Sequence, residues 1–267
     1  MSGFNITGNG KNWYGYFPEL RAAGFVNAFT CRMNGQSLLM PNELNLALHV
    51  GDDQQAVIRN RELIAQAIGF SLSRVVTCQQ VHGADIAVVT ESEMGRGSKA
   101  LEDCIANVDA LITAASNVPL MLFFADCVPI ILADSKRGIS AAVHAGWKGS
   151  MAEITLRTVH KMREEFGSRP EDIVAAIGPA IGACCYEVDE TVYNKGEKYK
   201  KHFRSSRSGH WHLDLAQVNK QQLLLGGVPE NNILLASVCT AENKALFFSH
   251  RAELGKTGRF AAIIFRK

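Results

Sequence analysis

The sequence lacks any run of about 18 consecutive apolar residues, the length that a membrane-spanning helix needs, so we expect no transmembrane segment. Residues 1–11 are polar and rich in glycine, and they contain no apolar stretch of the kind found in a secretory signal. The sequence also lacks an excess of one charge. Its 28 Lys and Arg residues against 26 Asp and Glu residues give a formal net charge of +2. That balance does not indicate nucleic acid or an anionic membrane as a partner.

No internal repeat, low-complexity tract or linker rich in Pro or Ser divides the chain, so residues 1–267 are expected to form a single domain. The seven cysteines are odd in number and show no regular spacing, which argues against a disulfide framework. These absences favour a reduced, cytoplasmic protein. We interpret the adjacent pair Cys184 and Cys185 as packing residues, because a disulfide between neighbours is strained. The sequence leaves the oligomeric state open.

Near-continuous apolar runs dominate the centre of the sequence and predict strands buried on both faces. They cover residues 119–125, 128–133 and 139–143. Further strands are expected at residues 25–31, 74–79, 86–89, 173–177, 233–238 and 260–265. The basic segment 195–207 is interrupted by polar residues and is expected to be a solvated loop.

Three helices are predicted from apolar periodicity and from the residues at their ends. The first covers residues 54–68, which carry apolar side chains at helical spacing. The second is expected to begin at Ser150, since Ser150 and Glu153 have the spacing of a capping box. The third is expected to run from Asp214 to Gly226. Strands and helices mix without strict alternation, so the predicted class is α+β, with helices packed outside stacked mixed sheets.

Three short segments each place a side chain that can bind a metal at or next to the end of an apolar strand. These side chains are His82, Cys127 and His144. Two neutral imidazoles and a thiolate suit Zn²⁺ in a tetrahedral site, and three protein ligands leave one position open, as a catalytic zinc requires. Asp126 is expected to orient one of these metal ligands without binding the metal itself. Asp126 and His49 are also the candidate general bases. Copper is the expected substitute for zinc.

These segments resemble the YfiH-type family, also described as a laccase-domain or polyphenol oxidase family and as a purine nucleoside phosphorylase family. Its most specific motifs are Ala-Asp-Cys-Val-Pro at 125–129 and His-Ala-Gly-Trp at 144–147, and the resemblance extends from about residue 25 to residue 265. It places the family's three zinc ligands on His82, Cys127 and His144. It implies one catalytic domain with an α/β/β/α sandwich, similar to cysteine-hydrolase-like folds.

The resemblance also implies phosphorolysis of adenosine, inosine and methylthioadenosine, with adenosine deamination as a second activity. Phosphorolysis needs an anion site, and the helix expected at Ser150 would offer free amides. Lys148 stands where the family usually has Arg, and it would add charge to that site. The expected contacts to nucleoside or phosphate are Arg32, Asn45, Lys148 and Arg251.

Three other functions stay open. A copper-dependent polyphenol oxidase needs several His-x-His pairs for a copper cluster, and this sequence has one, at residues 210–212. A Cys-His hydrolase, such as an editor of peptidoglycan precursors, would use Cys127 as nucleophile and His144 or His82 as base, without metal. A metal-binding protein without enzymatic activity would leave the open zinc position unexplained.

Overall fold

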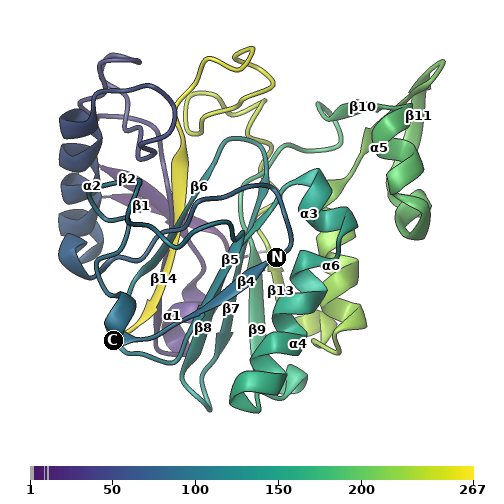
Figure 1. Ribbon diagram of the computed structural model, residues 1–267. Coiled ribbons are helices and arrows are strands. Elements are labelled where there is room, and N and C mark those ends of the chain that lie inside the picture. The colour runs from purple at the N-terminus through teal and green to yellow at the C-terminus, as the bar shows by residue number, and fades with distance from the viewer. Residues whose placement is uncertain (1–2, 9, 11) are drawn as a thin grey trace.

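Two large β-sheets form the centre of the computed structural model, which describes residues 3–8, 10 and 12–267 (Figure 1). The first sheet is antiparallel, with strand order β1-β2-β3-β14-β6. Its strands are β1 (Asn5–Gly8), β2 (Trp13–Tyr16), β3 (Phe25–Thr30), β6 (Leu120–Phe124) and β14 (Phe260–Arg266).

The second sheet is mixed, with strand order β13-β9-β7-β8-β5-β4. The pairs β13/β9 and β4/β5 are parallel, and the other neighbours are antiparallel. Its strands are β4 (Ile86–Val89), β5 (Ala110–Thr113), β7 (Val128–Asp134), β8 (Ile139–Ala145), β9 (Ile173–Ile177) and β13 (Ile233–Leu235).

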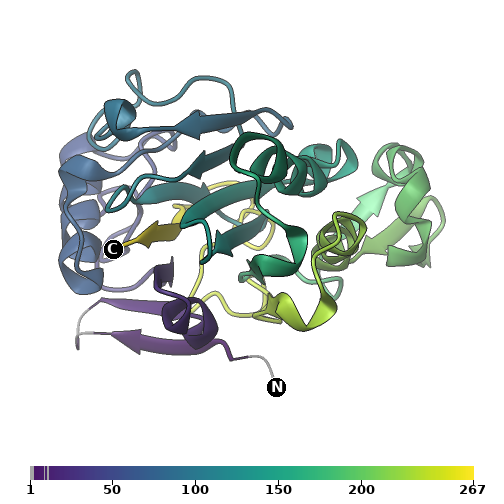
Figure 2. The same ribbon diagram turned by 90° about the horizontal axis from the view of Figure 1, so that it is seen from below.

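The two sheets pack face to face, and helices cover their outer faces (Figure 2). A buried apolar core lies between them, where Phe29 and Phe124 of the first sheet meet Ile131 and Ala142 of the second. Helix α2 (Gln54–Ile68) covers the outer face of the first sheet, and α4 (Ile154–Phe166) and α6 (Leu215–Leu225) cover that of the second. These four layers confirm the predicted α/β/β/α sandwich. Shorter elements are α1 (Pro18–Ala22), α3 (Trp147–Met151) and the 3₁₀ turns η1 (Leu72–Arg74), η2 (Glu91–Glu93), η3 (Pro170–Asp172) and η5 (Glu230–Asn232).

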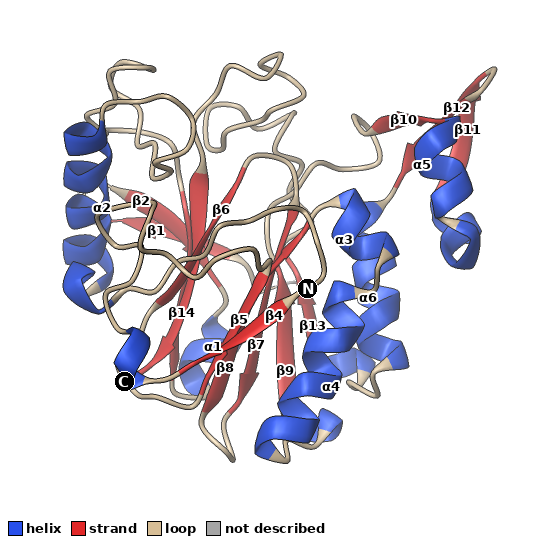
Figure 3. Cartoon of the chain, viewed as in Figure 1, coloured by secondary structure: helices blue, strands red, loops and turns tan. Residues whose placement is uncertain are grey.

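A small third sheet projects beside the sandwich together with helix α5 (Glu190–Lys195) (Figure 3). Its strand order is β10-β12-β11, and its strands are β10 (Glu187–Asp189), β11 (Phe203–Arg207) and β12 (His210–Leu213). The prediction of a loop at residues 195–207 is therefore wrong, because η4 (Glu197–His202) and β11 occupy it. The ring of Trp211 stacks on Tyr193 with 3.9 Å between centroids, which anchors this sheet to α5.

Two of the three predicted helices are confirmed with their starting residues. Asp53 caps α2 by accepting a hydrogen bond from the Ala56 amide at 2.7 Å. Asp214 caps α6 by accepting one from the Gln217 amide at 3.0 Å. In both cases a carboxylate satisfies an amide that the helix itself leaves unpaired.

The capping box predicted at Ser150 is wrong. Helix α3 already begins at Trp147, and the Ser150 amide donates to the Gly146 carbonyl at 2.8 Å. The Ser150 hydroxyl instead accepts from Asn219 of α6 at 2.9 Å, so a contact between helices has replaced the local cap. Glu153 has a φ of +65° and separates α3 from α4. No free helix start therefore lies at Ser150.

The strand predicted at residues 74–79 is absent, and the one predicted at residues 233–238 is shorter than expected. Residues 75–79 are extended but are joined to their neighbours only by isolated bridges, from Val76 to Leu120 and from Cys78 to Ile105. Strand β13 ends at Leu235, and the chain after it forms only an isolated bridge, from Cys239 to Ala180. In the described part of the chain no helix is long and apolar enough to cross a bilayer.

Candidate metal centre

The crossing of the chain between the two sheets sets the position of Cys127. Strand β6 ends at Phe124 in the first sheet, and β7 begins at Val128 in the second. Strand β8 runs antiparallel to β7, so that Pro129 lies opposite His144. Cys127, directly before β7, therefore lies beside His144 at the end of β8. Both strands are fully buried, which gives the two side chains a rigid support.

A carboxylate that the sequence interpretation missed aligns both histidines. Asp109 is fully buried directly before β5, and its Oδ1 lies 2.7 Å from Nδ1 of His144. The same carboxylate accepts hydrogen bonds from the amides of Val81, His82 and Gly83 at 3.2, 2.9 and 2.6 Å. The proton on Nδ1 of His144 then points to Asp109, which leaves Nε2 free for a ligand bond. The only sequence signal was an acidic residue before an apolar run, a pattern without a unique meaning.

The backbone at His82 has a φ of +60°, which a residue with a side chain rarely adopts. The amide bonds to Asp109 hold this conformation. A Cβ atom at Gly146 would lie 2.9 Å from Cδ2 of His82 and 3.2 Å from Sγ of Cys127. Glycine is therefore needed at position 146 for His82 to approach the other two side chains.

Asp126 does not orient a ligand, which corrects the expectation from the sequence. Its Oδ1 accepts a hydrogen bond from the Thr240 hydroxyl at 2.7 Å, and its Oδ2 accepts one from the Arg251 amide at 2.6 Å. The carboxylate therefore fixes the segment that carries Arg251 beside the metal-binding side chains. Asp109 performs the orienting role that had been expected of Asp126.

The donor atoms of His82, Cys127 and His144 all lie within 4.8 Å of one another. Burial alone would raise the pKa of the Cys127 thiol, but the charge and hydrogen bond of His144 outweigh it and lower the pKa to about 6. Burial alone would lower the pKa of His144, but Cys127 and Asp109 raise it to about 9. Without a metal, the surroundings thus favour a Cys127 thiolate paired with a protonated His144, and a metal ion would bind there by displacing the proton on Nε2 of His144. This donor set fits a metal ion, and the group is able to hold one.

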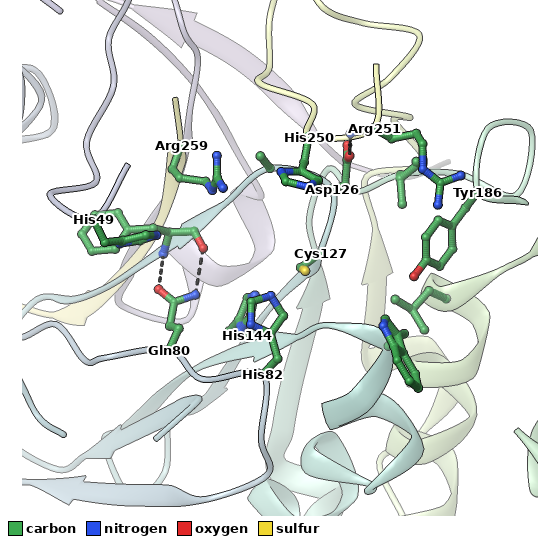
Figure 4. A pocket seen from close by; sticks show the side chains of 15 residues that line it. His49, Gln80, His82, Asp126, Cys127, His144, Tyr186, His250, Arg251 and Arg259 are labelled. Atoms are coloured by element: carbon green, nitrogen blue, oxygen red, sulfur yellow. Dashed lines mark hydrogen bonds between the residues drawn. The ribbon is translucent and has the colours of Figure 1, made fainter. Parts of the chain in front are cut away.

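A cavity of about 460 Å³ opens onto these three side chains (Figure 4). Arg251 and Arg259 lie on the wall across from His82 and His144, and Cys127 lies between the two walls. The remaining polar lining comes from His49, Gln80, Asp126, Tyr186 and His250. The metal-binding side chains therefore lie on one side of the cavity, and two positively charged arginines lie on the other.

Burial sets the protonation state of two residues that line the cavity. Desolvation by the surrounding protein, followed by the charges of Arg259 and Arg61, lowers the pKa of His49 to about 4, so its imidazole is neutral at pH 7. Burial raises the pKa of Tyr186, which therefore keeps its phenolic proton. His49 is able to accept a proton and Tyr186 is able to donate one.

Of the four expected substrate contacts, only Arg251 lines the cavity. Arg32 is buried, and its guanidinium forms ion pairs with Glu43 at 2.8 Å and Glu253 at 2.9 Å, which leaves no free face for phosphate. Lys148 is exposed outside the cavity, with its Nζ 5.8 Å from the ring centroid of Trp147.

Asn45 acts through a neighbour. It is fully buried, and its Oδ1 accepts a hydrogen bond from the Arg259 amide at 2.9 Å. It therefore positions the backbone of Arg259 and does not touch the cavity. The sequence interpretation gave Arg259 no role, although the segment 257–259 contributes to the family resemblance.

Comparisons with known proteins find relatives over almost the whole chain. Residues 26–267 match the family model described as multi-copper polyphenol oxidoreductase laccase. The chain is 41% identical over 250 residues to the purine nucleoside phosphorylase YlmD of Geobacillus stearothermophilus, covering 92% of this chain and 91% of that protein. It is 33% identical over 254 residues to a purine nucleoside phosphorylase of Bacteroides thetaiotaomicron, covering 93% and 94%.

Solved structures show the same fold. The crystal structure of YlmD from Geobacillus stearothermophilus superimposes with a TM-score of 0.95 at 38% identity and covers 100% of both chains. The hypothetical protein YfiH of Bacillus licheniformis gives a TM-score of 0.92 at 36% identity and covers 95% of this chain and 96% of its own. The likeness therefore extends over the whole sandwich.

Proposed function

The chain belongs to the multi-copper polyphenol oxidoreductase laccase family, and from this premise we propose that it is a zinc-dependent purine nucleoside phosphorylase acting on adenosine, inosine and methylthioadenosine. One observation carries the proposal. A single cavity joins the His82, Cys127 and His144 group to a wall with Arg251 and Arg259. A nucleoside and an inorganic phosphate are the two substrates that such a cavity suits. The names of the relatives support the same activity.

The donor set favours zinc over a copper cluster. In the part of the chain that the structure describes, one group of metal-capable side chains contains histidine, and it offers three ligands. The pair His210 and His212 lies in β12 of the projecting sheet and does not join that group. When bound to two imidazoles and a thiolate, zinc supplies a Lewis acid with one open coordination position.

The residues of the wall have separable roles in phosphorolysis. Arg251 and Arg259 bind phosphate and keep its negative charge next to the ribose. A phosphate oxygen forms a bond to C1′ of the ribose as the bond from C1′ to the base nitrogen breaks. The base leaves with the electron pair of that bond and takes up one proton. Tyr186 lines the same cavity and carries a phenolic proton, so we assign it as the donor.

A hydrolytic deamination of adenosine would use the same cavity. It requires a base that is unprotonated at neutral pH, and His49 meets that requirement because its pKa is lowered to about 4. His49 also lines the cavity, on the side of Arg259 (Figure 4). We therefore include adenosine deamination in the proposal as a second activity.

The proposal is tested by the dependence of base release on phosphate. We expect inosine and adenosine to yield free base and ribose 1-phosphate when inorganic phosphate is present, and the rate of base release to fall to background without it. Quantifying ribose 1-phosphate and free ribose separately distinguishes phosphorolysis from hydrolysis. Equal rates of base release in both buffers, with free ribose as product, would exclude a phosphorylase.

The two arginines predict a selective effect on phosphate. Arg251→Ala and Arg259→Ala should each raise the KM for phosphate about tenfold or more, because each removes a charged hydrogen-bond donor from the anion. The KM for the nucleoside should change less. Lys148→Ala is the matched comparison, since Lys148 is also cationic but lies outside the cavity. A larger effect at Lys148 than at either arginine would restore the phosphate site expected from the sequence.

A Cys-His hydrolase is the second candidate, and one observation favours it. Cys127, His144 and Asp109 are arranged as a nucleophile, a base and a carboxylate that orients the base. His82 favours the metal centre over this alternative. It is held near the thiol in a rare backbone conformation, and a triad has no use for a third donor.

A further inference from the structure

Three cysteine thiols meet behind the active-site cavity. Cys184 and Cys185 lie in a tight turn, in which the Cys185 amide donates to the Gly182 carbonyl at 3.0 Å. Cys239 comes from the segment after β13 and is joined to this turn, because its Sγ accepts a hydrogen bond from the Gly182 amide at 3.3 Å. The three Sγ atoms lie within 4.8 Å of one another. Segments about fifty residues apart in the sequence thus bring their sulfur atoms to one point.

The thiols border a second cavity. Its volume is about 330 Å³, and Cys184, Cys239 and Glu242 contribute to its lining. Cys184 is exposed there, whereas Cys185 and Cys239 are partly buried. Ile181 lines both this cavity and the active-site cavity, so one side chain belongs to the wall between them. An ion from solvent can therefore reach the sulfur atoms without entering the active site.

The local backbone leaves room for the sulfur atoms. A Cβ atom at Gly182 would lie 3.1 Å from Sγ of Cys184 and 3.5 Å from Sγ of Cys239. Burial and the neighbouring thiol of Cys239 raise the pKa of Cys184, and burial also raises the pKa of Cys185. The thiols of Cys184 and Cys185 therefore keep their protons at neutral pH, and a cation would bind by displacing them.

We propose that Cys184, Cys185 and Cys239 form a second metal site, which binds a thiophilic closed-shell cation, Zn²⁺ or Cu⁺. Three thiolates are the soft donors that these ions prefer. The two ions differ in their need for a further ligand. Cu⁺ is satisfied by the three sulfur atoms, whereas Zn²⁺ needs a fourth donor to complete a tetrahedron, and Glu242, which lines the same cavity as Cys184 and Cys239, is the candidate for it.

A cation at this site would support the active-site wall. Cys185 is followed by Tyr186, which lines the active-site cavity. Cys239 is followed by Thr240, whose hydroxyl donates to Asp126 and so helps to hold the Arg251 segment. The ion would tie these two segments together. Its role is structural, because none of its ligands lines the active-site cavity.

The test counts metal ions bound by the full-length chain. The reduced protein is stripped with a chelator, loaded with Zn²⁺ or with Cu⁺, desalted, and analysed for metal per chain. We expect two Zn²⁺ ions in the wild type, one in Cys127→Ser, one in Cys239→Ser and none in the double variant. Cys104→Ala, which removes another buried thiol, should still bind two. One Zn²⁺ in the wild type, with none in Cys127→Ser, would overturn the proposal.

Two further measurements identify the ligands. Co²⁺ bound to Cys127→Ser should give intense thiolate-to-cobalt absorption, which the additional Cys239→Ser change removes. Glu242→Gln should weaken Zn²⁺ binding about tenfold or more while leaving Cu⁺ binding unchanged. The mass of the aerobically purified wild type is also compared with its calculated mass. A wild-type mass that is lower by two hydrogens, together with the full calculated mass in Cys239→Ser, would show a disulfide in place of a metal site. None of these readouts depends on which substrate the enzyme uses.

Discussion

Replacement of Cys127 by serine is expected to remove the active-site metal and the catalytic activity together. A serine hydroxyl is a poor zinc ligand because it does not readily lose its proton, whereas a thiolate binds zinc strongly at neutral pH. The surroundings already lower the pKa of the Cys127 thiol to about 6. Activity should fall at least about 100-fold, since even the loss of a residue that only hydrogen-bonds to a metal ligand lowers metal affinity or activity about 10–100-fold. Metal content and initial rate are measured on the same preparation.

The same variant separates a metalloenzyme from a cysteine hydrolase. His82 and His144 remain in Cys127→Ser, so an excess of Zn²⁺ should restore part of the activity. A nucleophilic cysteine predicts an inactive variant at every metal concentration. It also predicts that the wild type forms a covalent adduct with an electrophilic substrate analogue, visible by mass spectrometry. A fully active wild type that is free of zinc would contradict the metalloenzyme account before any substitution is made.

Asp109→Asn should have the second largest effect. The carboxylate is fully buried and accepts from His144 and from three consecutive amides, including that of His82. An amide side chain has one acceptor oxygen and turns its NH₂ group toward groups that also donate. Both histidines should lose their alignment, and zinc affinity should fall about 10–100-fold. Competition with a chromophoric chelator measures this affinity. At saturating zinc the site is filled again, so the kcat of the variant should lie closer to the wild-type value than its zinc affinity does.

Asp126→Asn is the matched control for Asp109→Asn. Asp126 is a buried carboxylate beside Cys127, but it holds Thr240 and Arg251 and touches neither histidine. Its substitution should raise the KM for phosphate with little change in zinc affinity. Equal losses of zinc affinity in the two variants would mean that disturbance of the fold, and not the alignment of His82 and His144, explains the result at Asp109.

The sequence predicted the layers of the fold better than the connections between them. The apolar runs at 119–125 and 128–133 correctly indicated buried strands, and these are β6 and β7. Nothing local shows that the two strands belong to different sheets. The short turn around Asp126, with a φ of +87°, makes that crossing and places Cys127 at the cavity. Local patterns report burial, whereas the partner of a strand depends on residues far along the chain.

The capping box at Ser150 failed for a similar reason. Ser150 and Glu153 have the right identities and spacing, but Asn219 of α6 binds the Ser150 hydroxyl. Tertiary packing thus overrode a local preference worth about 1 kcal/mol. The helix on which the expected phosphate site was built starts at Trp147 and not at Ser150, and Lys148 lies outside the cavity that Arg251 and Arg259 line.

The sequence by itself determined the class of the fold and the three side chains of the metal-binding group. Ligand chemistry is a property of residue type, and His82, Cys127 and His144 keep that chemistry wherever the chain places them. Only the tertiary structure decided which carboxylate orients the histidines, which arginines face the cavity and that Cys239 joins Cys184 and Cys185. Asp109, Arg259 and Cys239 resemble ordinary polar or small residues in the sequence. Their roles come from contacts that form when distant segments pack against each other, and such contacts leave no local pattern.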